Sequence, residues 1–396
     1  MPTLFDPLTI RGVTLRNRIC MAPMLQCSAE KGFANDWHLV HLGSRAAGGA
    51  ALVMTEAVAV EPLGRIGQSD LGIWDDAHVA GLNRITDFVH SQGAIAGIQI
   101  AHAGRKASYA LPFDSSGPVP LRFLPLGNGG WNPQGPSAIA FDKEAPLPAE
   151  MDKGDIDRVI GAFADAASRA KAAGFRWVEL HAAHGYLMHA FCSPVSNTRK
   201  DMYGGTFENR TRLMRQIVRA VRNSLDEDQV LAVRISYTDW VHGGWRLEDS
   251  IKLMRFLESD GVDVIDVSSG GSTPAQQVLL QEMMDLSKQP DRKVAQIPVG
   301  PCYQVPGAAA VKQACNMYVG AVGLITEARQ ADDIIRDGKA DLIYLGRALL
   351  RDPYWPLRAA VELGETARTR LPAQYYLGWN GYERFAYSPV SAPHQT

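Results

Sequence analysis

Short apolar runs alternate with longer helical stretches along most of the chain, and this alternation constrains the fold more than any other sequence feature. The runs are continuously apolar, as is typical of parallel strands covered on both faces. Eight such runs occur, at residues 18–22, 51–54, 95–100, 177–181, 230–235 and 262–267, within 317–325, and at 340–345. Eight strand–helix units predict an α/β chain folded as a (β/α)8 TIM barrel.

The stretches between the runs have helical periodicity and end at stop residues such as Gly174. The predicted helices lie at 37–47, 76–91, 155–173, 208–225, 247–260, 306–315, 328–337 and 354–363. A doubly wound open sheet is the weaker alternative, because no G-x-G-x-x-G motif follows the first strand.

Three segments fall outside this alternation. Residues 107–148, after the third strand, and 269–305, after the sixth, are long loops expected at the C-terminal face of the barrel, where active sites are built. Residues 364–396 form an aromatic-rich C-terminal extension. We therefore predict a barrel over residues 1–363 and a tail that packs on the barrel or on a neighbouring subunit.

Composition excludes several classes of protein. The 40 Lys and Arg residues balance 42 Asp and Glu residues, which argues against a nucleic-acid partner. No apolar run approaches the ~20 residues of a membrane span, and the N-terminus does not resemble a secretory signal. The five cysteines are odd in number and include no C-x-x-C motif. They favour a reducing, cytoplasmic location over a disulfide framework or a structural zinc site.

Glycine and arginine residues follow the last two predicted strands. Gly346 lets backbone N–H groups approach an anion, and Arg347 can donate to it with two nitrogens. Gly320 and Gly323 lie at the preceding strand, and barrel phosphate sites commonly follow the seventh and eighth strands. The pattern favours a phosphorylated cofactor or substrate, although turn-forming glycines beside a surface arginine would give the same sequence.

Two histidines, His181 and His184, close the fourth predicted strand and are followed by Tyr186. Two imidazoles at a strand end can direct N–H groups at a carbonyl oxygen that gains negative charge. A metal pair is the rival interpretation, but Glu179 and Cys192 are poor candidates for a third ligand. We therefore expect no metal site.

Gln99 and Arg234 are polar residues inside otherwise apolar strands. An unpaired polar group there would cost several kcal/mol, so each needs a partner. A ligand in the barrel mouth would serve, and so would an internal ion pair of Arg234 with Glu56 or Asp266. The sequence pattern alone does not favour either.

Six longer motifs occur in order and at consistent spacing. They are NRICMAPM at 17–24, IQIAHAGRKA at 98–107, VELHAAHGYL at 178–187, SPVSNTRKDMYGGTFENR at 193–210, VGAVGLIT at 319–326 and IYLGRALLRDP at 343–353. Together they resemble the Old Yellow Enzyme family of FMN-dependent ene reductases, in particular its bacterial branch, over roughly residues 2–379. The resemblance implies a TIM barrel with FMN bound tightly at its C-terminal mouth and reduced by NADPH or NADH.

The resemblance also implies roles for the matching residues. Gln99 would meet the pyrimidine edge of the flavin, Arg234 the region of N1, and Gly346 with Arg347 the phosphate. The implied cofactor-binding residues are Ala22, Pro23, Met24, Leu25, Ala57, Gln99, Arg234, Gly320, Gly346 and Arg347. The implied substrate-binding residues are Cys27, Lys106, His181, His184, Tyr186 and Trp379. His181 and His184 would bind the substrate carbonyl, and Tyr186 would donate a proton.

The implied activity is reduction of small α,β-unsaturated carbonyl compounds. Hydride would pass from flavin N5 to the β-carbon, and one site shared by both substrates would give ping-pong kinetics. A homodimer or homotetramer is expected. The alternative is a phosphate-binding barrel lyase or isomerase without FMN, although residues 262–267 lack the lysine that a Schiff-base enzyme would place there.

Three positions depart from the family pattern. Leu25 stands where the bacterial branch usually has a cysteine, and Cys27 where it usually has a tyrosine. Leu377 stands where related tails often carry an arginine that reaches a neighbouring subunit. We expect a wider pocket, with Cys27 open to alkylation unless burial raises its pKa.

Overall fold

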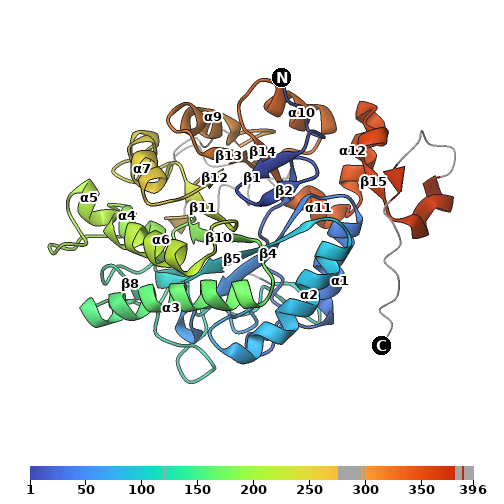
Figure 1. The fold of residues 1–396 in the computed structure, drawn as a ribbon. Helices are drawn as coiled ribbons and strands as arrows, with labels where there is room; N and C mark the ends of the chain where they lie inside the picture. The colour runs from blue at the N-terminus through green and yellow to red at the C-terminus, as the bar shows by residue number, and fades with distance from the viewer. Residues whose placement is uncertain (120–121, 275–296, 298, 380–385, 388–396) are drawn as a thin grey trace.

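The computed structural model describes residues 1–119, 122–274, 297, 299–379 and 386–387, and its centre is a closed barrel of eight parallel strands (Figure 1). Around the ring they are β3 (Ile19–Met21), β4 (Leu52–Ala59), β5 (Ile95–Ala101), β10 (Trp177–Ala182), β11 (Val230–Ser236), β12 (Val264–Ser268), β13 (Tyr318–Ala321) and β14 (Leu342–Leu345). The ring closes where β14 pairs with β3, with Ile343 opposite Ile19. The predicted TIM barrel is confirmed.

The helices lie outside the barrel (Figure 1). Those that match predicted helices are α1 (Asp36–Ala47), α2 (Val79–Ser91), α3 (Lys153–Ala172), α5 (Phe207–Arg210) with α6 (Arg212–Ser224), α7 (Leu247–Ser259), α9 (Val305–Gln313), α10 (Ala328–Arg336) and α12 (Trp355–Leu363). Local chemistry sets their ends, as in α3. The Asp152 side chain accepts from the Asp155 N–H at its start, and Gly174 follows its end with a φ of +87°.

Several elements were absent from the prediction. Two short helices, α4 (Leu187–Cys192) and α11 (Arg347–Arg351), follow the fourth and eighth barrel strands directly. They have six and five residues, too few to show a helical apolar period. The loop 107–148 contains the two-residue strands β6 (Phe113–Asp114), β7 (Gly117–Pro118) and β8 (Gln134–Gly135), and β8 pairs with β9 (Ala149–Glu150). Most of the predicted loop 269–305 lies outside the described residues.

The first strands of the chain form an antiparallel hairpin, β1 (Leu8–Ile10) with β2 (Val13–Leu15). Its Ile10, Val13 and Leu15 belong to the same buried apolar cluster as Trp177 and Leu342 of the barrel strands. A second cluster contains the outward-facing strand residues and the apolar faces of the helices. The hairpin therefore closes the N-terminal end of the barrel interior, and in the described part of the chain the interior is open to a ligand at its C-terminal end.

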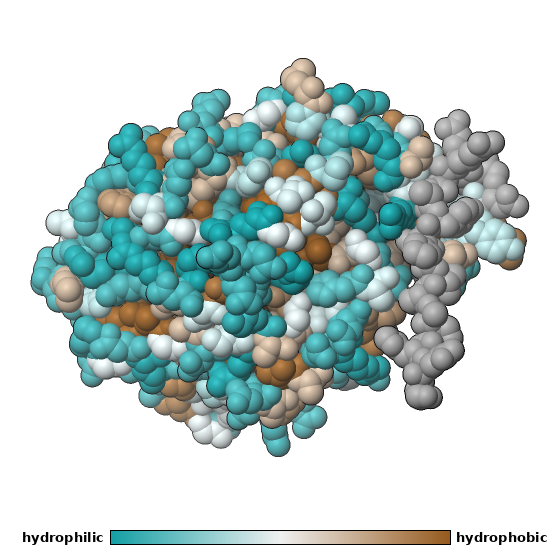
Figure 2. Space-filling model, in the orientation of Figure 1, coloured by the Kyte–Doolittle hydropathy of each residue, from teal (hydrophilic) through white to brown (hydrophobic). Residues whose placement is uncertain are grey.

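The tail begins after α12 and differs in burial along its length. Leu371, in β15 (Arg370–Leu371), is fully buried and belongs to the main core, and β15 pairs with β16 (Ala386–Tyr387). The 3-10 helix η5 (Ala373–Trp379) is mostly exposed, with Leu377 69% accessible. The space-filling view shows a largely polar surface (Figure 2). Among the described residues, no helix is long and apolar enough to cross a membrane.

Candidate active site

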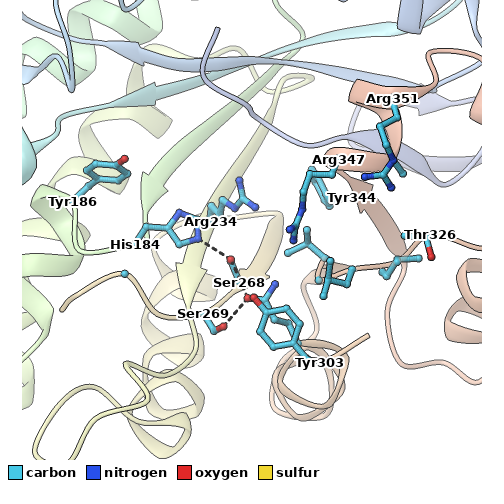
Figure 3. A pocket seen from close by; sticks show the side chains of 18 of the residues that line it. His184, Tyr186, Arg234, Ser268, Ser269, Tyr303, Thr326, Tyr344, Arg347 and Arg351 are labelled. Atoms are coloured by element: carbon cyan, nitrogen blue, oxygen red, sulfur yellow. Dashed lines mark hydrogen bonds between the residues drawn. The ribbon is translucent and has the colours of Figure 1, made fainter. Parts of the chain in front are cut away.

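A cavity of about 670 Å³ opens at the C-terminal ends of strands β10 to β14. This volume lies within the usual range of ligand pockets. Two kinds of side chain mark its ends in Figure 3: His184 and Tyr186 lie at one end, Arg347 and Arg351 at the other, and Arg234 lies between them. The cavity is therefore elongated, with cationic groups at one end and aromatic ones at the other.

The cationic end is built from the turns after β13 and β14. Gly346 caps the start of α11, and Arg347 and Arg351 are one helical turn apart on it. Gly323, with a φ of +121°, supplies a turn that other residues rarely adopt. Two guanidinium groups beside glycine backbone suit a phosphate group.

The structure does not bring Gly320 to this end of the cavity. Gly320 lies within β13, and a side chain there would collide with the ring of Tyr344 on the neighbouring strand. Its lack of a side chain therefore makes room for Tyr344, and the cavity is lined by Gly323 instead. Of the two glycines predicted at this strand, Gly323 therefore lines the cavity and Gly320 does not.

The imidazoles of His181 and His184 meet edge to face, with ring centroids 5.1 Å apart, and the ring of Tyr186 lies 4.8 Å from that of His181. Burial and the positive charge of Arg234 lower the pKa of both histidines well below the usual value. Both rings are therefore neutral at pH 7. Nδ1 of His181 accepts from the Ala183 N–H at 3.3 Å, so its remaining proton is on Nε2.

His184 occupies a left-handed backbone conformation, with a φ of +59°. Its N–H donates to Ser236 Oγ at 3.0 Å, and its carbonyl accepts from Lys106 Nζ at 2.8 Å. Lys106 also donates to the Gly271 carbonyl at 3.0 Å. The next N–H, that of Gly185, donates to Nδ1 of His189 at 2.9 Å. Hydrogen bonds with Ser236, Lys106 and His189 therefore fix the turn that follows His181 and carries His184.

The imidazole of His184 already has a partner on β12. Its Nε2 lies 2.7 Å from Ser268 Oγ, and Gln304 Oε1 accepts from Ser268 at 3.3 Å and from Ser269 at 2.6 Å (Figure 3). A substrate oxygen at His184 would therefore compete with Ser268 for this imidazole.

Arg234 has one of its two foreseen ion partners and also borders the space that a ligand would occupy. Arg234 lines the cavity, and its Nε lies 3.0 Å from Asp266 Oδ2 on the neighbouring strand. Glu56, the other predicted ion partner, lies 3.3 Å from His38 instead. Gln99 donates to Glu179 Oε1 at 2.7 Å and is 1% exposed. A buried carboxylate on a neighbouring strand thus contacts each of the two polar strand residues.

The segment after β3 runs along the rim of the barrel. Ala22 is buried, Pro23 and Met24 are half-buried, and Leu25 is 40% exposed. Met24 lies close to Gly346, because a Cβ on that glycine would be 3.6 Å from the Met24 sulfur. This segment therefore borders the cationic end.

Cys27 is half-buried and has a φ of +50°. Burial, together with the carboxylates of Asp70 and Glu56, raises the pKa of its thiol to about 12. The thiol therefore stays protonated at neutral pH, and the condition for its alkylation is not met.

Two further cavity residues have shifted pKa values. Burial and the neighbouring Arg105 lower the pKa of Lys106 to about 7, and burial raises that of Tyr186 above its usual range. The Lys106 ammonium lies 4.9 Å from the centre of the Tyr186 ring. Ala57, 7% exposed, follows a register shift in β4 next to Gln99 on β5.

Cys27 and His181, two of the predicted substrate-binding residues, are not among the residues that line the cavity, although the ring of His181 contacts that of His184. The single chain does not bring Trp379 to the cavity either. This tryptophan borders a separate hollow with Arg358, Val361 and Glu362 of α12. A contact of Trp379 with substrate would therefore need a second subunit.

Several cavity residues were missed from the sequence, most of them in loops. They are Ser268, Ser269, Tyr303, Gln304, Thr326 and Arg351. Arg351 lay within a quoted motif, four residues after Arg347, and that spacing was the available signal. Within the described residues, no group of three His, Cys, Asp or Glu side chains could hold a metal ion.

The residues that line the cavity fit FMN. Arginines and glycine backbone occupy one end, and the cavity continues past a buried guanidinium, which suits the N1 region of a flavin, to the neutral imidazole of His184. A parallel barrel with this site at its C-terminal face defines the class of flavin-dependent barrel oxidoreductases.

Comparison with known proteins identifies the family. Residues 3–365 match the NADH:flavin oxidoreductase / NADH oxidase family, and the chain belongs to it. The resemblance inferred from the motifs is thus confirmed, FMN is the cofactor, and the alternative of an FMN-free lyase or isomerase is wrong.

Individual relatives agree with this assignment. The chain is 42% identical to the NADPH dehydrogenase of Geobacillus thermodenitrificans, over 95% of this chain and 98% of the relative. Morphinone reductase has the same fold, with a TM-score of 0.71 and 24% identity over 92% of this chain and 90% of that one. A 2-naphthoyl-CoA reductase superposes with a TM-score of 0.76 and 24% identity over 93% of this chain, which spans about half, 53%, of that longer protein.

Proposed function

We propose that this protein is an ene reductase, which uses NADPH to reduce the carbon–carbon double bond of small α,β-unsaturated carbonyl compounds. The observation that carries the proposal is the neutral imidazole of His184 at the end of the cavity away from Arg347 and Arg351, with the neutral imidazole of His181 packed edge to face against it. Bound FMN would accept hydride from NADPH and pass it to the β-carbon of the substrate.

The side chains have separate parts in this proposal. His181 and His184 donate N–H groups to the carbonyl oxygen, which draws charge toward that oxygen and makes the β-carbon electrophilic. Because both imidazoles are neutral, they polarise the carbonyl without giving up a proton completely. Tyr186, whose hydroxyl keeps its proton at neutral pH, supplies a proton to the α-carbon.

The remaining site residues bind the cofactor in the proposal. Gly346, Arg347 and Arg351 hold the phosphate, and Arg234 and Gln99 hold the pyrimidine edge of the flavin. Ala22, Pro23, Met24, Leu25 and Ala57 border the ring system, and Cys27 and Lys106 border the substrate.

NADPH is proposed as the donor because relatives at 42–43% identity are named NADPH dehydrogenases. Donor and acceptor would use the same opening in turn, since the other end of the barrel is closed by the hairpin β1–β2. We propose a cytoplasmic location, in keeping with five cysteines that are all free.

Two subunits or four are proposed for the assembly. Support comes from apolar side chains exposed on α1 and the tail, among them Trp37 (55%), Val40 (65%) and Leu377 (69%). In a homo-oligomer this surface would be covered, and Trp379 of one chain could approach the cavity of another. Size-exclusion chromatography with light scattering tests this, and a monomer at micromolar concentration would contradict it.

The test of the function separates the two half-reactions. The purified protein should be yellow, and NADPH should bleach the flavin absorbance under argon. Adding 2-cyclohexenone to the reduced enzyme should restore the colour and yield cyclohexanone in equal amount. Bleaching without reoxidation by any member of a panel of enones and enals would contradict the ene-reductase proposal while leaving the flavin assignment intact.

A further inference from the structure

A layer of buried polar side chains fills the barrel interior between the apolar lower core and the cavity. Gln99 on β5 stands opposite Glu179 on β10, and Arg234 on β11 stands opposite Asp266 on β12. Tyr344, on β14, faces the same group of residues. All five side chains belong to residues that are 7% exposed or less.

The hydrogen bonds of this layer do not satisfy its carboxylates. Gln99 donates to one oxygen of Glu179, and Arg234 pairs with Asp266 Oδ2 at 3.0 Å. Within the described part of the chain, Glu179 Oε2, both carboxylate oxygens of Asp266 and the Tyr344 hydroxyl have no hydrogen-bond partner, because the contact of Asp266 with Arg234 is an ion pair without hydrogen-bond geometry. A buried, ionised carboxylate oxygen without a hydrogen-bond donor costs free energy. Protonation of one of the two carboxyl groups would reduce this cost.

Charge counting leads to the same conclusion. Two ionised carboxylates and one guanidinium would leave a net negative charge inside the barrel, while one added proton makes the layer neutral. Burial raises the pKa of both carboxyl groups. Arg234 lowers the pKa of both groups, whereas the charge of Asp266 raises that of Glu179 further. Glu179 is therefore the favoured position for the proton.

The other titratable groups around the layer do not supply a compensating charge. Cys20 on β3 and Tyr344 on β14 face it, and burial together with the two carboxylates raises the pKa of both well above their usual values. His181 lies one inward-facing position above Glu179 and is neutral. Arg234 is therefore the cation that the described strands place directly in the layer.

We propose that Glu179 and Asp266 share one proton beneath the flavin, and that this proton couples the redox state of the cofactor to pH. The proposal rests on the proposed placement of the flavin pyrimidine edge over Arg234 and Gln99. Two-electron reduction of FMN takes up one proton and leaves one negative charge near N1. When the carboxyl pair is fully ionised, Glu179 gains a second proton from solvent in the same reduction, so the buried charge does not increase.

A merely structural role predicts something different. If the two carboxylates only orient Gln99 and Arg234, reduction takes up one proton per two electrons at every pH. Under the proposal, uptake rises from one proton to two as pH passes the value at which the oxidised pair loses its proton. The electrons come from the reductant in both cases, so only the proton count distinguishes them.

The experiment measures the midpoint potential of the holoenzyme by spectroelectrochemistry between about pH 6 and pH 10, the range that spans a raised carboxyl pKa. Wild-type protein should show the slope doubling with rising pH. Glu179→Gln, a neutral mimic of the protonated acid, should keep the shallow slope throughout. Asp332→Asn, which removes a buried carboxylate on α10 that does not line the cavity, should behave as wild type.

Redox difference infrared spectroscopy supplies an independent readout on the same samples. Wild-type protein at alkaline pH should gain a deuterium-sensitive carboxylic C=O band on reduction, and Glu179→Gln should lose it. A wild-type slope of one proton throughout, with no such band, overturns the proposal even if Glu179→Gln fails to fold. No enone is present in either measurement, so an enzyme without ene-reductase activity would still give a clear result.

Discussion

The two ends of the barrel interior are formed by the same strands but differ in chemistry. At the N-terminal end, Trp177 and Leu342 pack with the hairpin residues in a buried apolar cluster. Four positions further along β10 from Trp177 stands His181, beside Arg234 on the next strand. The N-terminal end, here called the lower end, stabilises the fold by burying apolar surface. The C-terminal end, here called the upper end, instead has polar groups directed at a ligand. Mutations at the lower end should therefore reduce stability more than activity, and mutations at the upper end should reduce activity more than stability.

The sharpest test of that separation is the histidine pair. Replacing His181 and His184 together with Ala should lower the rate of enone reduction by ~10²-fold or more, because oxyanion donors are lost. FMN content and melting temperature should change little. Stopped-flow reoxidation by 2-cyclohexenone and titration with p-hydroxybenzaldehyde measure the effect, and wild-type affinity for that phenol in the double variant would refute the assignment.

The lower end should give the opposite result. Leu342→Ala removes a fully buried side chain and should reduce the free energy of unfolding by about 2–5 kcal/mol, through lost burial and a residual cavity. Folded enzyme should retain its turnover per bound flavin. Urea denaturation and activity normalised to flavin absorbance check both parts, and a large loss of turnover in fully folded protein would break the comparison.

Arg234 lies at the boundary between the two ends, and its loss should affect the cofactor first. Arg234→Met should weaken binding of FMN by roughly tenfold or more, since a charge-assisted contact is removed and Asp266 is left unpaired. The reduction potential should also fall, because the cation favours the anionic reduced flavin. Apoprotein titration with FMN provides the measurement; unchanged occupancy together with an unchanged potential would contradict this placement.

Lys106 provides a pH test of the upper end. Its pKa of about 7 in the folded protein lies below the ~10.4 of an unfolded chain, so between these values the unfolded state binds more protons. The stability of wild type relative to Lys106→Met should therefore rise with pH in this window, by up to about 1.4 kcal/mol per pH unit. Urea denaturation at several pH values gives the difference, and a constant or falling difference would exclude the lowered pKa.

The smallest effects are expected at the rim. Cys27 should resist iodoacetamide at pH 8 in the folded protein and react after denaturation, because its pKa is about 12. Leu25→Cys should shift the flavin potential slightly, since a thiol can donate weakly to a ring atom whereas Leu cannot. Mass spectrometry follows the alkylation. Rapid labelling of Cys27 in native enzyme would show that the rim is more open than the structure indicates.

The contrast between the two ends also explains what the sequence could predict. Barrel strands buried on both faces leave continuous apolar runs, so β5 and β11 were located within one residue of their observed ends. The hairpin β1–β2 was missed because its three-residue strands are too short for a periodic signal. Strand length was underestimated in β4, where a register shift after Met54 interrupts the pairing.

Among the residues that line the cavity, His184 and Arg347 could be predicted because they closely follow strand ends in the sequence. Ser268 and Gln304 could not, since their contact joins positions 36 residues apart. The alternatives for Arg234 could not be separated from the sequence because both hold: it pairs with Asp266 and it lines the cavity. Such dual roles depend on three-dimensional register, which spacing does not reveal.

The closing hairpin has a consequence for biosynthesis. Ile10 and Val13 emerge from the ribosome among the first residues, but their partner Leu342 is more than three hundred residues downstream. At about 5–20 residues per second, the hairpin waits roughly 15–70 s with its apolar side chains uncovered. Until β14 has left the ribosome, β3 lacks its partner strand and the N-terminal end of the barrel is incomplete. A chaperone can bind the exposed apolar surface during this interval. The barrel can therefore close only after its last strand, β14, has been synthesised, although the hairpin β1–β2 that covers its N-terminal end is synthesised first.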